Sequence, residues 1–209
     1  MSNYFRTDNW LDIISRCKDR TALKRYDIGD TKNITLKNGD ELELVIIGKE
    51  HDLLQNNKKS TFTISFSKCL SPDYKLDCSD KLVDWSNCDF RNINCKQIID
   101  LFPYSISNSM KEVVKHSIRD EKDIYTYDLL WLLSKRELVG VGPNEGNQYE
   151  YYKENTLKKV RCTLNTPVTY HTRSLQSFDD KSFYYVNEQG EIDYGKSYIN
   201  RCALLAFCI

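Results

Sequence analysis

The chain has 209 residues, of which 40% are hydrophobic and 29% are charged, so it can bury a substantial core and is too apolar to be disordered throughout. Thirty basic residues balance thirty acidic ones, which gives no reason to expect a nucleic-acid partner. No apolar run approaches the ~20 residues that cross a bilayer, and the N-terminus lacks the apolar segment of a secretory signal. We therefore expect one domain over residues 1–209, made in a cytoplasm and not inserted in a membrane.

The first predicted element is a helix within residues 1–25. Thr7 or Asp8 is available as its N-cap. Its apolar residues recur at helical spacing and share one face: Trp10, Ile13, Ile14 and Cys17. We expect this face to pack on the chain's own core, and the alternative is that it docks a neighbouring subunit.

Alternating apolar residues next predict a β-hairpin in KNITLKNGDELELVIIG, where the body of the domain (33–209) begins. Its tight turn falls at Asn38-Gly39, a pair suited to the positive φ angles of such turns. A third strand is expected in STFTISFS, followed by a loop around Pro72. The apolar residues of these strands are Ile34, Leu36, Leu42, Leu44, Ile46, Phe62, Ile64 and Phe66.

Two helices are expected in the middle of the chain. The first has the face Cys95, Ile98, Ile99 and Phe102 and ends at Pro103. The second has the face Ile106, Met110, Val113 and Val114 and ends near His116.

A buried strand over residues 127–133 comes next. It leads into a short helix that begins with the capping-box pair Ser134 and Glu137. The loop GVGPNEGNQ follows this helix.

Short strands dominate the last part of the chain, in VTYHTRS, SFYYVN, EIDYG and CALLAFCI. Helices in the middle, strands at the end and no repeated βα unit predict an α+β fold. The terminal segment is apolar on both faces of an extended strand, so we expect it to lie inside the fold and to be covered on both sides.

Several segments resemble a known family in their order and spacing: NW-LDII, IGDTKNITLKNGDELELVIIGKEHD, STFTIS, DWSNCDFR, LFP, LLWLLSKREL, NQYEYYK, YHTRSL, SFYYVNEQGEI and AFCI. Together they resemble a domain family of unknown function from Firmicutes and their prophages. That family looks C-type-lectin-like and is related in fold to formylglycine-generating oxidases and phage variable receptor-binding proteins. The resemblance implies short, mostly antiparallel strands, two or three helices, long loops, and adjacent N- and C-terminal strands.

The same resemblance implies binding or assembly without catalysis or a cofactor. We expect a phage structural protein of the virion, in the tail or in receptor binding. Its partners would be other virion or tail subunits, or a host cell-surface protein or glycan, within an oligomer or larger assembly. Contacts would come from loops around 67–92 and 140–156 and from these residues: Trp85, Asn87, Arg91, Asn144, Tyr149, Tyr151, Tyr152 and Arg173.

The tyrosines of QYEYYKEN leave two interpretations open. An exposed cluster would suit recognition of protein or sugar, because tyrosine offers a large contact area at low entropic cost. Alternation along a strand would instead place Tyr149 and Tyr151 on one side and Tyr152 on the other, with part of the cluster in the core.

Metal and nucleophile sites receive weaker support. The segments 142–146 and 84–87 loosely resemble calcium-lectin motifs but occur in the wrong order and offer few carboxylates. His51-Asp52 could form half of a metal site or an oriented base, and His171 could pair with Ser174.

Eight cysteines are present, and none forms a C-x-x-C pair, which argues against a zinc ribbon. Without an export signal we expect reduced thiols that pack as small hydrophobic residues. Cys202 and Cys208 would lie about 20 Å apart on one extended strand, too far to bind one copper ion. A divergent formylglycine-generating-type oxidoreductase and a cytoplasmic host-interaction protein remain the alternative functions. The cysteines are Cys17, Cys69, Cys78, Cys88, Cys95, Cys162, Cys202 and Cys208.

Overall fold

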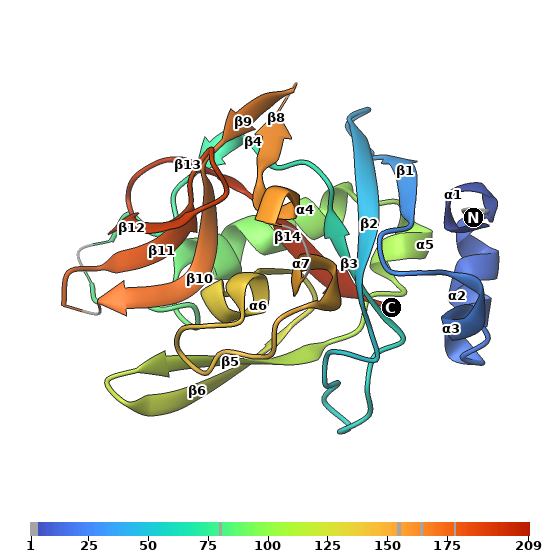
Figure 1. Cartoon of the computed structure of the whole chain (residues 1–209), viewed down its shortest axis with the longest axis horizontal. Helices are drawn as coiled ribbons and strands as arrows, with labels where there is room; N and C mark the ends of the chain where they lie inside the picture. The colour runs from blue at the N-terminus through green and yellow to red at the C-terminus, as the bar shows by residue number, and fades with distance from the viewer. Residues whose placement is uncertain (1–3, 80, 154–155, 164, 178) are drawn as a thin grey trace.

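The computed structural model describes residues 4–79, 81–153, 156–163, 165–177 and 179–209 (Figure 1). Its fold is mixed α/β, with many antiparallel strands and a few helices. Among the described residues the strands form two five-stranded sheets and two two-stranded ribbons. The helices are short and more numerous than the two or three expected from the sequence.

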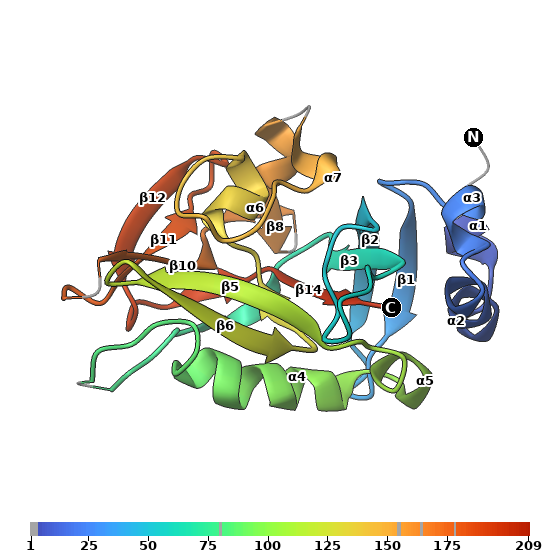
Figure 2. The ribbon, with the colours of Figure 1, turned by 90° about the horizontal axis from the view of Figure 1, so that it is seen from below.

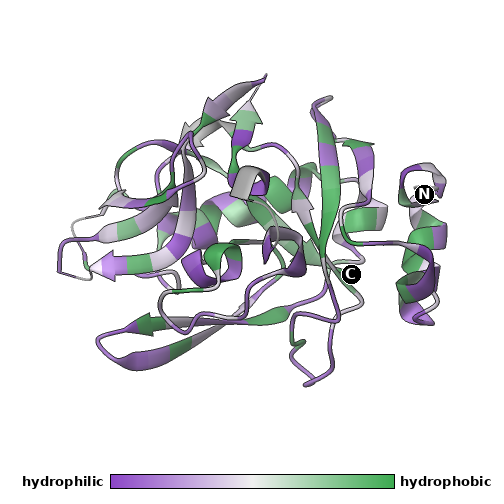
Figure 3. Cartoon of the chain, viewed as in Figure 1, coloured by the Kyte–Doolittle hydropathy of each residue, from purple (hydrophilic) through white to green (hydrophobic). Residues whose placement is uncertain are grey.

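The first sheet has the strand order β1-β2-β3-β14-β7, and its neighbours are antiparallel. The predicted hairpin is confirmed, since Ile34 pairs with Leu42 and Gly39 in the turn has a φ of +91°. Much of β2 is hydrophobic in Figure 3. The bounds are β1 Thr31–Thr35, β2 Glu41–Lys49, β3 Phe62–Phe66, β7 Trp131–Leu132 and β14 Leu205–Cys208.

The second sheet has the order β12-β11-β10-β13-β4, and its β10–β13 pair is parallel. The prediction of a loop around Pro72 is wrong, because this residue lies in β4. An edge strand accepts proline, since one side of its backbone has no partner to bond. The bounds are β4 Leu70–Tyr74, β10 Tyr170–Ser177, β11 Ser182–Val186, β12 Ile192–Lys196 and β13 Arg201–Ala203.

The C-terminal segment joins the two sheets. It forms β13 and, after Leu204, the strand β14, which lies between β3 and β7, and every residue from 201 to 209 is buried. The expectation of an interior strand covered on both sides is confirmed, although one strand has become two. The expected pairing of the first and last strands is wrong, because β2 and β3 separate β1 from β14.

Three short helices form the N-terminal part: α1 Tyr4–Thr7, α2 Trp10–Lys18 and α3 Ala22–Arg25. The predicted helix corresponds to α2, and Ile13 and Cys17 on its inner face are buried in the core. Its N-cap is Asn9, whose side chain accepts a hydrogen bond from Asp12 N at 3.0 Å. Asp8 is instead bound to Arg25 and to the Tyr26 hydroxyl, and Thr7 ends α1 and donates to the Tyr4 carbonyl at 3.3 Å, so neither is the cap.

The first predicted middle helix is confirmed. A π-helical turn, η1 Phe90–Asn94, continues into α4 Cys95–Leu101, and Pro103 separates α4 from the single turn of α5 Tyr104–Ser107. Figure 2 shows α4 leading along the chain toward α5.

The second predicted middle helix is wrong. Val113 and Val114 begin β5 Val113–Arg119, which pairs with β6 Lys122–Asp128. The turn residues Asp120 and Glu121 have φ values of 49° and 61°, so the chain reverses there without glycine. Alternate residues of β5 are buried, namely Val113, Lys115 and Ser117, and His116 lies on this strand instead of at a helix end. Of the face predicted for this helix only Ile106 is helical, in the single turn of α5.

The remaining elements follow β6. The predicted strand over 127–133 is divided between β6 and β7, with a bend at residues 129–130. The predicted helix is α6 Lys135–Val139, with its capping box formed by Ser134 and Glu137. The others are α7 Glu150–Lys153, η2 Thr156–Lys159, β8 Arg161–Thr163 and β9 Thr166–Val168.

Candidate functional site

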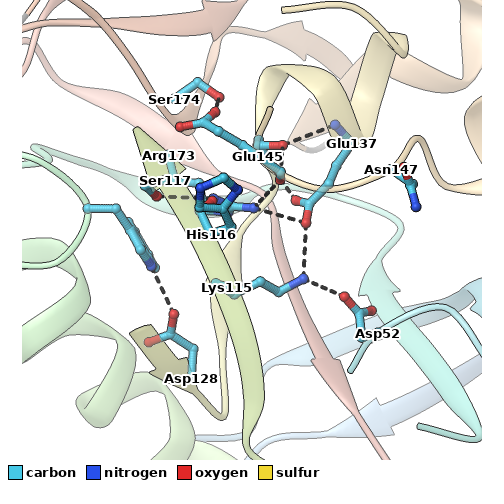
Figure 4. A network of polar contacts seen from close by, with 12 residues as sticks. Asp52, Lys115, His116, Ser117, Asp128, Glu137, Glu145, Asn147, Arg173 and Ser174 are labelled. Atoms are coloured by element: carbon cyan, nitrogen blue, oxygen red, sulfur yellow. Dashed lines mark hydrogen bonds and ion pairs between the residues drawn. The ribbon is translucent and has the colours of Figure 1, made fainter. Parts of the chain in front are cut away.

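A buried network of charged side chains lies between the two sheets (Figure 4). Its centre is Lys115 of β5, whose side chain is 2% exposed. Lys115 Nζ lies 2.5 Å from Asp52 Oδ1 and 3.0 Å from Glu137 Oε1. It also donates a hydrogen bond to the Tyr149 hydroxyl at 3.1 Å. One ammonium group therefore connects the segment after β2, helix α6 and the segment before α7.

Arg173 of β10 extends the network to the second sheet. Its side chain is fully buried, and Nη2 donates to Glu137 Oε1 at 3.0 Å and to the Glu145 carbonyl at 2.7 Å. Nη1 donates to the His116 carbonyl at 2.6 Å and to Ser117 Oγ at 3.2 Å. The guanidinium fork therefore fixes three chain segments at once.

Glu137 can accept from both cations because of the local structure of α6. Its Oε2 accepts the Ser134 N–H at 2.8 Å, and Ser134 Oγ accepts the Glu137 N–H at 3.0 Å. This capping box holds the carboxylate inward, so Oε1 faces Lys115 and Arg173.

The network is balanced between Lys115 and Arg173 on one side and Asp52 and Glu137 on the other. Burial opposes ionisation of both acids. Lys115 outweighs this effect at Asp52, and Arg173 together with Lys115 outweighs it at Glu137, so the pKa of each carboxyl lies below its ordinary value. Asp52 and Glu137 in turn raise the pKa of Lys115 against the effect of burial. All four groups therefore remain charged inside the protein.

Glu145 is the exception among the buried acids. Burial raises its pKa from 4.5 to about 7, and Arg173 opposes this effect only in part. Ser174 Oγ donates a hydrogen bond to the Glu145 carboxyl and accepts one from Lys135 N at 2.8 Å. Glu145 is thus a buried acid that titrates near neutral pH.

The candidate nucleophiles and bases lie in environments that suppress their reactivity. Burial raises the pKa of the Cys208 thiol well above its ordinary range. His171 is buried, its Nε2 lies 2.7 Å from the Tyr74 carbonyl, and burial lowers its pKa to about 3. The possible pairing of His171 with Ser174 is not formed, because Ser174 is bonded to Glu145 and Lys135.

His51 connects the buried network with the surface. Its ring lies against that of Tyr149 with the centroids 4.1 Å apart, and Tyr149 donates to Asp52. His51 Nε2 lies 3.1 Å from the Asn147 carbonyl and Nδ1 lies 3.4 Å from Glu150. Among the described residues no group of three or more His, Cys, Asp or Glu side chains is arranged to hold a metal ion.

Four of the eight predicted binding residues are buried, so they contribute to the core and not to a contact surface: Trp85, Tyr149, Tyr152 and Arg173. Trp85 Nε1 donates to Asp128 Oδ2 at 2.9 Å, and Arg91 Nε donates to Asp128 Oδ1 at 2.6 Å. Asp128 thus brings Trp85 and Arg91 together as a structural unit.

The tyrosine cluster does not form the expected strand. Tyr151 and Tyr152 lie on α7, with their ring centroids 5.1 Å apart, and Tyr149 directly precedes this helix. Tyr151 alone of the three is half-buried. The interpretation that part of the cluster belongs to the core is confirmed.

The two loops that resemble calcium-lectin motifs are engaged within the chain. Asp84 binds Arg119 and the hydroxyl of Ser86, and Glu145 points inward. Asn87 and Asn144 are exposed, and Asn87 Oδ1 accepts from Asp84 N at 2.7 Å.

An open pocket of about 560 Å³ was not foreseen from the sequence. Residues from α2, from segment 54–61, from α5 and the residues after it, and Ile209 line it, and we name it the α2–α5 pocket. Among the described lining residues five are basic and none is acidic: Lys18, Arg20, Lys58, Lys59 and Lys111. The Lys58-Lys59 pair was its only local signal, because the other cations come from distant parts of the sequence.

A smaller pocket of about 370 Å³ lies beside His51. It carries both charges, since Glu50 and Glu150 line it together with Lys59 and Lys153.

None of the helices in the described part of the chain has the length and apolar character that a membrane span requires.

A family model for a domain of unknown function, DUF6273, matches residues 67–208. No match was found among curated proteins or solved structures. The matched region contains the whole second sheet with β5, β6, β7 and β14, whereas β1 to β3 precede it. The phage origin, the lectin-like relationship and the virion location implied by the resemblance stay predictions. Since the match covers more than half of the chain, the chain belongs to the DUF6273 family.

Proposed function

We propose that the chain is a non-enzymatic binding module whose ligand occupies the α2–α5 pocket. The observation that carries this proposal is the composition of the pocket. Apolar residues line it together with basic side chains, and none of its described lining side chains is acidic. Its volume of about 560 Å³ falls in the range of small-molecule sites.

The location of the reactive groups supports binding over catalysis. Lys115, Glu137 and Arg173 are paired with one another in the interior, and Cys208 is held as a neutral thiol. Their contacts connect the two sheets and leave them without access to a substrate. A network satisfied in this way makes the scaffold rigid, which suits a preformed site.

The walls of the pocket are fixed to that scaffold. Thr61 N donates to the Ile209 carbonyl at 3.2 Å, and Thr61 Oγ1 donates to the Cys17 carbonyl at 3.0 Å. Lys111 N donates to the Cys208 carbonyl at 2.9 Å. Contacts of α2, of the residue before β3 and of the end of the chain after β13 therefore hold the pocket open without a ligand, and binding needs little reorganisation.

A ligand screen read by thermal unfolding tests this function. The library should span sugars, short peptides, nucleotides, organic acids and divalent cations. We expect at least one class to raise the Tm of the wild-type chain and to lose this effect in the double variant Lys58→Glu/Lys59→Glu. The matched control is Lys75→Glu/Lys122→Glu, which reverses two exposed lysines outside the pocket.

Two outcomes would contradict the proposal that the chain binds a ligand in the α2–α5 pocket without catalysis. One is a set of ligands that stabilise the wild type and the Lys58→Glu/Lys59→Glu variant equally. The other is turnover of any library compound that is lost when Lys115 or Glu145 is replaced in a folded variant.

A further inference from the structure

We propose that the ligand of the α2–α5 pocket is a small organic anion with an apolar body, such as an alkyl or aryl carboxylate or phosphate. The proposal rests on the binding function above and deepens it by naming the ligand class. It follows from four properties of the lining: its charge, its apolar wall, a buried hydroxyl and its saturated backbone.

The charge of the lining is positive and mostly uncompensated. Of the five basic residues, Arg20 is paired with Glu50. The structure shows no ion pair between any of the four lysines and a described carboxylate. These exposed cations are Lys18, Lys58, Lys59 and Lys111. They come from three separate segments that meet at one pocket, so their potentials add where a ligand would enter.

The apolar wall lies next to these cations. Leu11 is 70% exposed on the outer face of α2, and Ile14 one turn further along lines the same pocket. Leu54 and Ile209 line it from the segment after β2 and from the end of β14. An inorganic ion would contact only the lysines, whereas an amphiphilic anion would also cover the exposed leucine and remove its apolar surface from water.

A buried hydroxyl lines the pocket as well. Ser60 Oγ bonds to no oxygen or nitrogen of the described residues, and the polar group beside it is the neutral Cys208 thiol. Ser60 itself is only 1% exposed. Sulfur is a weak acceptor, so this hydroxyl would donate more strongly to an anionic head group than to the Cys208 thiol.

The backbone around the pocket is already paired, which favours a small molecule over an extended peptide. Leu54 N donates to the Lys58 carbonyl at 2.8 Å, and Ser60 N donates to the Asp52 carbonyl at 2.9 Å. Thr61 N and Lys111 N are bonded to the end of β14. No strand edge is thus offered here by the described segments, so recognition depends on side chains and not on strand addition.

Isothermal titration with octanoate tests the proposal, with 1-octanol and acetate as probes that lack the charge or the apolar body. We expect octanoate to bind wild type at least about tenfold more tightly than either probe, a difference of ~1.4 kcal/mol. The variant Lys58→Gln/Lys59→Gln should raise the Kd for octanoate about tenfold, whereas Lys75→Gln/Lys122→Gln should leave it unchanged. Leu11→Asn, at an exposed position, should weaken octanoate binding without unfolding the chain.

Raising the salt concentration should weaken octanoate binding further, because exposed charges are screened over a Debye length of ~8 Å at physiological ionic strength. Octyl phosphate distinguishes the source of the head group, and tight binding of either amphiphile supports the proposal. Equal affinity for octanoate and octanol, or for octanoate and acetate, would overturn it. If neither amphiphile binds while another ligand of the screen requires Lys58 and Lys59, the ligand class is wrong and the binding function stands.

Discussion

At the scale of single residues, the chain depends on Lys115 more than on any surface lysine. This ammonium separates Asp52 from Glu137, and both carboxylates are at least 94% shielded from water. Removing one partner of a buried ion pair leaves an uncompensated charge in a medium of low dielectric constant. The network is therefore a structural requirement of the fold.

Replacing Lys115 with methionine should destabilise the protein by about 3–5 kcal/mol, because Asp52 and Glu137 would remain buried without their shared cation. Urea denaturation of wild type and Lys115→Met measures this difference. Lys122→Met on the exposed neighbouring strand is the control and should stay within about 0.5 kcal/mol. Equal stabilities of Lys115→Met and the control would show that the network is not structural.

Glu145 should make stability depend on pH in a defined window. Its pKa is raised from 4.5 to about 7 in the folded protein, so the folded state binds more protons than the unfolded state between these values. Stability from this group is therefore fully present below about pH 4.5 and is lost as the pH rises to about 7.

Glu145→Gln should abolish that loss. We expect the difference in unfolding free energy between variant and wild type to shift in favour of the variant by roughly 2–3 kcal/mol from pH 4.5 to 8. Acids with lowered pKa values, such as Asp52, act in the opposite sense at lower pH and cancel in the comparison. A difference that stays constant across the window would show that Glu145 is ionised throughout.

Residue-level burial was the least predictable property of the sequence. Arg173 is an example, because we expected it at a contact surface and it is buried, which arginine almost never is without a partner. Its partner Glu137 lies 36 residues away in the sequence, and only the packing of β10 against α6 brings them together. Trp85 was misjudged for the same reason, since Asp128 satisfies its indole nitrogen from a distant strand.

At the scale of elements, the sequence predicted those helices and strands whose formation depends on neighbouring residues in the chain. The hairpin of β1 and β2 has alternating residues and an Asn-Gly turn, and α6 has a capping box. The prediction for the segment around Val113 was wrong, because a short apolar run fits both the 3.6-residue period of a helix and the two-residue period of a strand. Its strand is selected by pairing with β6, which sequence periodicity does not report.

The core strand β14 is the element on which the first sheet depends. Phe207 is fully buried, pairs with Ile64 of β3 in register, and packs its ring edge-on against Phe102 at 5.6 Å between centroids. Phe207→Ala should cost about 3–5 kcal/mol in urea denaturation, through lost burial and the cavity left behind. Val141→Ala, at a residue that is 66% exposed, should change stability by less than about 0.5 kcal/mol. A loss below about 1 kcal/mol for Phe207→Ala would show that β14 does not anchor the sheet.

At the scale of the whole molecule, the two sheets behave as one unit. β13 and β14 are consecutive but belong to different sheets, and the network of Lys115 and Arg173 joins them a second time. The order of the sheets could not be predicted from sequence, because β14 lies between strands that come from residues 62–66 and 131–132.

The family match begins at residue 67, yet β14 pairs with β3, which precedes it. A fragment of residues 67–209 would expose one edge of β14 and lose Asp52 from the network. We therefore expect this fragment to lack cooperative unfolding in circular dichroism, while the 209-residue chain unfolds in one transition. A fragment that unfolds cooperatively would show that β1 to β3 are dispensable.

The most direct test of the central claim is an amide NMR titration of the ¹⁵N-labelled chain with octanoate. The α2–α5 pocket predicts saturable shift changes concentrated at residues 11–20, 54–61 and 105–111. Saturable changes at the loops 67–92 and 140–156 instead, or no saturable change at any amide, would contradict the claim that this pocket binds an apolar anion.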